Sequence, residues 1–262
     1  MKISRLAPIL DKIAPVQMQE EWDNSGFQII FNDVDVLKIL VALEIGEKVI
    51  DEAISKDVQL IITHHPLFFH GIKSVDDNVN TGNQIIRLIN NKISVYSSHT
   101  PFDKVSGGNN DFFGKLLSIE KPMILPGDST GICRLGQLNK TMNVLEFADL
   151  VSKKLNIDKK YFSYCGPKEL SVKTVAWCTG SGSDFISLAM DSGCDLFVTG
   201  DLKYHTARNA RECGFAVMDC GHYATEKIFS ENYAGILSDL LDKDSIVDII
   251  SSCINLNPYE IL

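Results

Sequence analysis

Histidines and carboxylates gather where short apolar runs end in this 262-residue chain. Five of the six histidines lie at such places, namely His64, His65, His99, His205 and His222. Carboxylates lie four residues from three of these histidines. Asp103 follows His99, Glu226 follows His222, and Asp201 precedes His205. Imidazole nitrogens and carboxylate oxygens are the ligands of hydrolytic metal centres. The pattern therefore predicts a site with metal-dependent chemistry.

The first place is the pair His64-His65, which follows the apolar run Ile61–Thr63 and precedes Pro66. In open α/β sheets, ligands bind beyond the carboxyl ends of the strands. Adjacent residues of an extended chain point in opposite directions, so two neighbouring imidazoles suit two metal ions better than one. Taken alone, the pair is more typical of solvent-facing loop histidines, and the metal prediction depends on the other places.

His99 and Asp103 follow the next predicted strand. A carboxylate has two oxygens and can bridge two cations, so Asp103 is the natural bridging ligand. His99 is predicted to be a ligand or a proton carrier beside the metals. The alternative role for Asp103 is to cap a turn before Gly107-Gly108.

His222 and Glu226 are spaced four residues apart where a strand gives way to a predicted helix. On a helix this spacing puts both side chains on one face. It is the most specific pair in the sequence, although His–Glu pairs of this spacing also occur as ordinary surface contacts. Asp201 and His205 repeat the spacing, which predicts either a proton-transfer or substrate-facing pair or a remnant of a duplicated site.

Apolar, β-branched runs alternate with helical patterns along the chain. Strands are predicted at 38–44, 58–63, 93–98, 172–178, 195–199 and 215–220, and helices at 46–56, 82–91, 108–117, 143–155, 183–193, 203–213 and 223–241. Nearly continuous apolar strands between helices indicate mostly parallel sheets covered on both faces. The fold class is therefore α/β.

The two halves share one order of elements, in which three strands alternate with two helices and a histidine follows the third strand. This order predicts an internal duplication and two similar α/β domains, although any β-α-β-α-β stretch gives the same pattern. Prolines and glycines between Pro122 and Gly127 mark the boundary. We expect one domain at 1–124 and another at 125–262, with the C-terminal helix packing back on the first.

Composition limits the classes of function. The net charge of −9 disfavours broad binding of nucleic acids, which are polyanions. No apolar stretch approaches a membrane span, and the N-terminus lacks the apolar core of a signal peptide. Seven cysteines without a C-x-x-C pair predict reduced thiols. Together these features predict a cytoplasmic protein that does not bind membranes.

Several blocks in the same order resemble the family of GTP cyclohydrolase 1 type 2 homologs, also called the Nif-three-like or dinuclear-metal-centre family. The blocks are W-D-N-S-G at 22–26, I-I-T-H-H-P at 61–66, S-H-T-P-F-D at 98–103, V-T-G-D-L-K-Y-H at 198–205 and G-H-Y-A-T-E at 221–226. The resemblance implies a fold of two similar α/β domains, which agrees with the duplication. It also implies a ring-shaped homohexamer.

The resemblance further implies a pair of divalent ions in each chain, of Zn, Fe, Mn or Ni. The family's metal ligands fall on His64, His65, Asp103, His222 and Glu226, with Asp103 bridging. Glu44 falls where the family has a strand-ending aspartate.

The implied activity is hydrolysis of a nucleotide-like small molecule by a hydroxide that bridges the metals. His99 and His205 are then expected to move protons, and Asn24 and Lys203 to contact substrate. The alternative function is a non-enzymatic protein that binds or delivers metal, or a scaffold for partners.

Overall fold

The computed structural model describes residues 1–241 and 246–260, which form two compact α/β units. Unit 1 consists of Met1–Val105 and Phe229–Leu256, and unit 2 consists of Ser106–Ile228 with the residues from Asn257 onward. The predicted α/β class is confirmed. The predicted domain boundary at 124/125 differs from the unit boundary at 105/106, because Phe113, Leu117 and Ile119 pack in the core of unit 2.

Unit 1 is built on a sheet with the strand order β1-β4-β3-β2-β11. Its strands are β1 (Gly26–Ile29), β2 (Lys38–Ala42), β3 (Leu60–Thr63), β4 (Ser94–Ser97) and β11 (Asp248–Ser251). Strands β11, β2, β3 and β4 run parallel, and β1 pairs antiparallel with β4. The carboxyl ends of the parallel strands therefore lie at one edge of the sheet.

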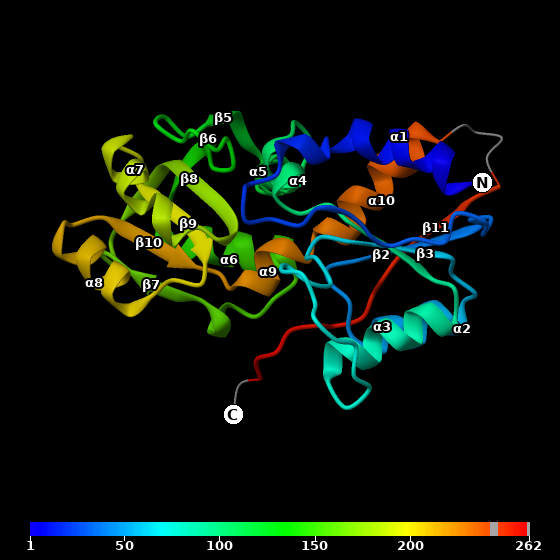
Figure 1. The fold of residues 1–262 in the computed structure, drawn as a ribbon. Helices are drawn as coiled ribbons and strands as arrows, with labels where there is room; N and C mark the ends of the chain where they lie inside the picture. The colour runs from blue at the N-terminus through cyan, green and yellow to red at the C-terminus, as the bar shows by residue number, and fades with distance from the viewer. Residues whose placement is uncertain (242–245, 261–262) are drawn as a thin grey trace. The chain divides into compact units, whose positions relative to one another are not determined.

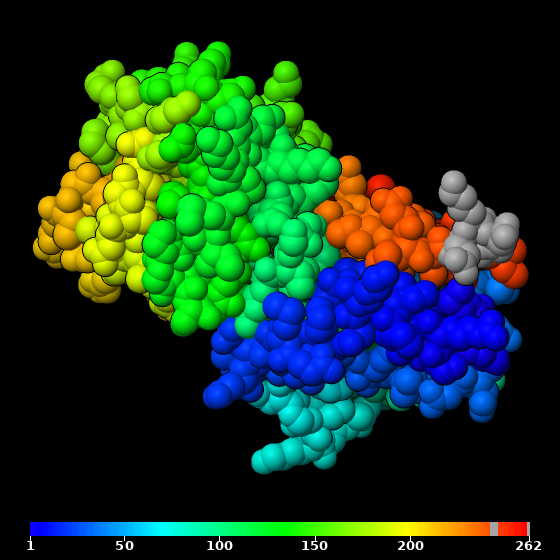
Figure 2. All heavy atoms as spheres, turned by 90° about the horizontal axis from the view of Figure 1, so that it is seen from above, coloured from blue at the N-terminus to red at the C-terminus, as the bar shows by residue number. Residues whose placement is uncertain are grey.

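Helices cover both faces of this sheet (Figure 1). They are α1 (Ile3–Ile13), α2 (Glu47–Ser55), α3 (Asn80–Asn90), α4 (Thr100–Lys104) and α10 (Phe229–Leu240), with a 3-10 turn at Val16–Met18. Alternate residues of a strand face opposite sides. Ile39 and Val41 of β2 accordingly pack with α1 and α10, whereas Leu40 and Ala42 pack with α2 and α3. Figure 2 shows α1, in blue, against α10, in orange.

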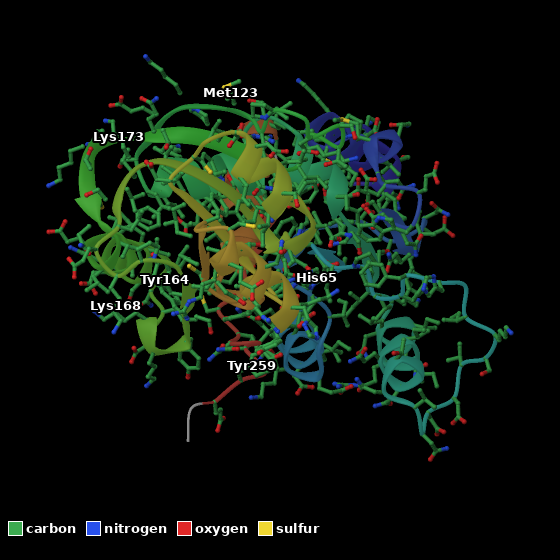
Figure 3. All side chains as sticks on the ribbon, turned by 90° about the vertical axis from the view of Figure 1, so that its left-hand side faces the viewer. His65, Met123, Tyr164, Lys168, Lys173 and Tyr259 are labelled. Atoms are coloured by element: carbon green, nitrogen blue, oxygen red, sulfur yellow. The ribbon has the colours of Figure 1, made fainter. Side chains whose placement is uncertain are left out.

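Unit 2 has a mixed sheet with the strand order β5-β6-β8-β9-β10-β7. Its strands are β5 (Ile119–Ile124), β6 (Arg134–Asn143), β7 (Ser163–Cys165), β8 (Ser171–Ser181), β9 (Leu196–Gly200) and β10 (Ala216–Asp219). Strands β8, β9 and β10 are parallel, and β5, β6 and β7 pair antiparallel with their neighbours. Met123 is exposed on the edge strand β5 (Figure 3).

The helices of unit 2 also pack on two faces. They are α5 (Asn109–Leu116), α6 (Val144–Leu155), α7 (Ile186–Asp191), α8 (Tyr204–Glu212) and α9 (His222–Glu226), with 3-10 turns at Lys159–Tyr161 and Ser183–Phe185. Trp177 lies in one core with α5, α6 and α9, and Phe197 lies in the other with α7 and α8. Asn143 and Glu146 form a capping box that starts α6 after the long strand β6.

The predicted duplication is present in the topology. In unit 1, β2-α2-β3-α3-β4 leads to the short helix α4, and in unit 2, β8-α7-β9-α8-β10 leads to the short helix α9. An earlier strand pairs antiparallel with the last one in each unit, β1 with β4 and β7 with β10. Matching hydrogen bonds, Ser98 N to Thr63 O and Cys220 N to Thr199 O, both 2.8 Å, keep the strand ends in the same register.

Candidate metal centre

In unit 1, three histidines meet at the carboxyl ends of β3 and β4. His64 and His65 follow β3 directly, and His99 stands two residues after β4. A ring nitrogen of each lies within 4.8 Å of one from each of the others. Strands β3 and β4 are parallel neighbours, so their carboxyl ends lie side by side. This brings His65 and His99, which are 34 positions apart in the sequence, into one group of histidines.

His64 is fully buried and has a defined tautomer. Its Nδ1 lies 3.0 Å from the backbone carbonyl of Ser98, which can only accept, so Nδ1–H donates this hydrogen bond. In the neutral form of the ring, Nε2 therefore carries the lone pair. That nitrogen lies 3.7 Å from Oδ2 of Asp103, a buried residue of α4. His64 thus presents a metal-binding nitrogen toward a carboxylate.

The other two histidines are held by carboxylates. His65, labelled in Figure 3, donates from Nδ1 to Oε2 of Glu44 at 3.1 Å. His99 donates from Nδ1 to Oδ1 of Asp23 at 2.8 Å. Acceptors at Nδ1 fix the ring and leave Nε2 as the basic nitrogen, as in metal sites where a carboxylate orients a histidine ligand. Glu44, whose role the sequence left open, thus orients His65.

Asp23 belongs to the W-D-N-S-G block at 22–26 but was not among the predicted site residues. Its side chain is fully buried and accepts hydrogen bonds from His99, Ser25 Oγ at 3.0 Å and both the backbone N and Oγ1 of Thr100. Burial alone would raise the pKa of Asp23, but the bonds from His99, Thr100 and the Asn24 backbone hold it well below its usual range. Asp23 is therefore an anion that orients His99.

In unit 2, His222 and Glu226 are the first and last residues of α9, and the predicted shared face is present. His222 Nδ1 lies 2.7 Å from Oδ2 of Asp201, and its Nε2 lies 2.8 Å from Oε2 of Glu226. Carboxylate oxygens at both ring nitrogens stabilise a positive charge here, whether a proton or a metal ion. The acceptor at Nδ1 again directs Nε2 to the second carboxylate.

Gly180 leaves space for the side chains of His222 and Glu226. Gly180 has φ +67°, and a Cβ there would lie 1.9 Å from Oε1 of Glu226 and 3.4 Å from Nε2 of His222. Its backbone N–H donates to Oγ1 of Thr225 at 2.9 Å, which ties the end of β8 to α9. Only glycine leaves space for the buried Glu226 carboxylate at this position.

These residues fit a divalent metal. The groups combine imidazole Nε2 atoms with buried carboxylates, a nitrogen and oxygen donor set that zinc, iron, manganese and nickel accept. Nδ1 of each of the four histidines meets an oxygen acceptor, which makes Nε2 the nitrogen that can coordinate a cation, and the Nε2 atoms of His64 and His222 face the carboxylates of Asp103 and Glu226. The arrangement can bind metal ions and place basic imidazoles beside them.

The remaining predicted residues lie in less enclosed positions. Asn24 donates from Nδ2 to the carbonyl of Phe68 at 2.7 Å, so it links two loops of unit 1. Lys203 and His205 are exposed at the start of α8. Asp201 accepts from His222 Nδ1, and His205 contacts the ring of Tyr204, so the two residues of the predicted Asp201–His205 pair have different partners. None of the helices in the described residues has the length and apolar character of a membrane span.

Comparisons with known proteins give a consistent result. The model of the family described as Duf34/NIF3 (NGG1p interacting factor 3) matches residues 1–258. The "GTP cyclohydrolase 1 type 2 homolog" of Clostridium perfringens is 36% identical over 266 residues, covering 100% of both chains. The "GTP cyclohydrolase 1 type 2" of Helicobacter pylori is 32% identical and covers 90% of this chain and 91% of that protein. The crystal structure of a Staphylococcus aureus hypothetical protein superposes with a TM-score of 0.93 at 28% identity, covering 100% of this chain and 99% of that one.

Proposed function

Since the chain belongs to the Duf34/NIF3 family, we propose that it is a metal-dependent hydrolase that acts on a nucleotide-like substrate. The observation that carries the proposal is the common orientation of four imidazoles, each bonded at Nδ1 to an oxygen acceptor. Bound divalent ions would supply a nucleophile at neutral pH by lowering the pKa of water.

On the sequence resemblance, five residues are proposed to hold a pair of ions. They are His64, His65 and Asp103 in unit 1 and His222 and Glu226 in unit 2. Burial of His64, Asp103 and Glu226 supports this role, because the attraction between these ligands and a cation is stronger where water is excluded.

His99 is proposed to move protons during the reaction. Its Nε2 is the basic nitrogen because Nδ1 is bonded to Asp23, and the negative charge of Asp23 stabilises the imidazolium that forms when Nε2 accepts a proton. Asn24, Lys203 and His205 are retained as proposed contacts, and exposure of the last two suits a substrate that reaches them from solvent.

The names of the relatives point to GTP as the substrate. Hydrolysis would then open the imidazole ring of guanine and release formate. The test is to load the purified protein separately with zinc, iron, manganese and nickel and to measure formate and nucleotide products. Turnover that His99→Gln lowers by about 10²–10⁴-fold while bound metal is retained would support the assignment. No formate with any of the four metals would overturn it.

Metal stoichiometry tests the ligand set separately. We expect about two ions per chain in the wild type and loss of both in Asp103→Asn, because that carboxylate is proposed to bridge them. Asp33→Asn, an exposed aspartate of the same unit, is the matched control and should keep both ions. Loss of a single ion in Asp103→Asn would contradict bridging.

The second candidate function is a protein that binds or delivers metal without catalysis. His99 favours it, because a ring nitrogen of His99 lies in the same group as those of His64 and His65 and would add a further protein ligand. Ligation completed by protein side chains leaves no position for water or substrate. This candidate predicts bound metal with no turnover, and transfer of the metal to a competing chelator.

The resemblance also supports a homohexamer that works in the cytoplasm. The cysteines are free thiols, as expected for a reducing compartment. Sedimentation equilibrium should give about six times the chain mass of 29.1 kDa. A mass of one or two chains would contradict the hexamer.

A further inference from the structure

Two large aromatic side chains stand in solvent beside His99. Trp22 is 56% exposed and Phe69 is 42% exposed. The ring centroids of Trp22 and Phe69 lie 5.6 Å and 5.5 Å from that of His99, with interplanar angles of 75° and 73°. Their own rings lie 6.4 Å apart at 35°. Apolar surface that is exposed next to a chemical site is a common feature of ligand recognition.

Both rings stand on anchored loops. Trp22 directly precedes Asp23, whose buried carboxylate is fixed by His99, Ser25 and Thr100. The loop that carries Phe69 is held from the other side, since Asn24 Nδ2 donates to the Phe68 carbonyl at 2.7 Å and Leu67 N donates to Oε1 of Gln28 at 2.6 Å. A preformed aromatic surface binds with little loss of conformational entropy.

We infer that Trp22 and Phe69 form a stacking site for a planar heteroaromatic ring, of the size of a purine base. This inference rests on the proposed function, because it places the substrate's base beside the histidine proposed to move protons. Aromatic side chains bind nucleobases through their π faces whatever the base. The site therefore selects the ring system, and the discrimination among bases comes from other groups.

Intrinsic fluorescence offers a direct test, because the chain has two tryptophans and Trp177 is fully buried in the core of unit 2. Quenching by an added ligand therefore reports Trp22. With excitation at the red edge of the indole band, we expect guanosine and GTP to quench the wild-type protein saturably. Ribose 5-phosphate, which lacks a base, should not quench it. Absence of saturable quenching by guanosine would overturn the inference.

Two variants test the aromatic pair. Phe69→Leu keeps an apolar side chain but removes the π face, and should weaken guanosine binding by about 10-fold. Trp22→Leu should do the same when binding is measured by calorimetry. Tyr259→Leu is the matched control, because Tyr259 is also an exposed aromatic residue and is not among the proposed site residues. Equal guanosine affinity in all three variants would overturn the inference.

The outcomes separate this inference from the proposed function. Guanosine is added to protein from which metal has been removed, so binding is measured without turnover. Aromatic-dependent binding without formate production under any metal would keep the stacking site and reject the hydrolase. Formate production with an unchanged KM in Trp22→Leu and Phe69→Leu would keep the hydrolase and reject the stacking site. A changed sedimentation mass in both variants with unchanged guanosine affinity would assign the pair to contacts between copies and also reject it.

Discussion

Each candidate ligand histidine has an oxygen acceptor at Nδ1, and these acceptors lie 21 to 76 residues away in the sequence. The types and local spacing of the ligands could be predicted from the chain, because His64-His65 and the pair of His222 and Glu226 are local patterns. Their orienting partners could not, because Asp23 reaches His99 only after β1 and β4 pair. For the same reason, the contact of Asp201 with His222 could not be predicted, since these residues are 21 positions apart in the sequence.

The orienting role of Asp201 gives a prediction for a single side chain. Asp201→Ala should lower the metal affinity by about 10–100-fold, since His222 loses the acceptor that directs its Nε2. Competition with a chromogenic chelator measures this affinity. His205→Ala is the control and should match the wild type, because His205 is exposed and contacts Tyr204. An equal loss of metal affinity in both variants would contradict the prediction, because it would not depend on the hydrogen bond from His222 to Asp201.

Asp23 gives a prediction about pH. Its pKa in the folded protein lies below the ordinary value of 3.8, so its hydrogen bonds stabilise the fold fully above that value and are lost as the pH falls. Asp23→Asn should therefore cost about 2 kcal/mol of unfolding free energy at neutral pH and progressively less in acid. Urea unfolding of both proteins at neutral pH and near pH 3 tests this. A constant difference between the two proteins would contradict it.

At the scale of elements, the strands and helices that position the site follow from periodicity. The six predicted strands are present, with ends shifted by a few residues. The predicted helix at 223–241 is two helices, α9 and α10, which separate at Lys227-Ile228. Helix α1 was missed although Ile3, Leu6, Leu10 and Ile13 form a buried stripe, because Pro8 interrupts the pattern. The short or largely exposed strands β1, β5, β7 and β11 carry too weak a signal.

The equivalent elements of the two units carry different ligands. The matched register aligns α4 with α9, so Asp103 corresponds to Thr225, and Thr100 corresponds to His222. His64 and His65 correspond in the same way to Gly200 and Asp201. The duplication therefore explains why both ligand groups lie at the same ends of equivalent strands, while the side chains at those ends have diverged.

The end of β8 gives a prediction about backbone space. Gly180→Ala should displace Glu226, because the added Cβ would meet its carboxylate, and metal affinity should fall. Gly193→Ala is a matched control, since Gly193 has a similar φ of +70° but no atom within 4 Å of an added Cβ. Both variants should lose about 1–2 kcal/mol from the left-handed backbone. Only Gly180→Ala should also lose metal, and loss in both would refute the steric argument.

At the scale of the whole molecule, the α/β class, the repeat and the return of the C-terminal helix to the first domain could be predicted, but the position of the boundary between the units could not. Helix α10 follows unit 2 in sequence and belongs to unit 1, where Phe229, Tyr233 and Leu237 are buried with α1. Tertiary packing decides this assignment, because an amphipathic helix fits any apolar face that is left uncovered. Because α10 belongs to unit 1, segments from before and after unit 2 in the sequence together form the core of unit 1.

Metal binding should be measurable as an increase in the thermal stability of the folded protein. A ligand that binds only the folded state stabilises it by about 2.7 kcal/mol when it is present at a hundred times its Kd. For a chain of this size that corresponds to a rise in Tm of roughly 5–10 °C. Added metal should raise the Tm of chelator-treated wild type and of Asp33→Asn by this amount, because Asp33 is an exposed aspartate of unit 1. Asp103→Asn should lose most of the rise, since its buried carboxylate lies beside Nε2 of His64. An equal rise in Asp103→Asn would place the stabilising metal elsewhere on the chain and remove Asp103 from the ligand set.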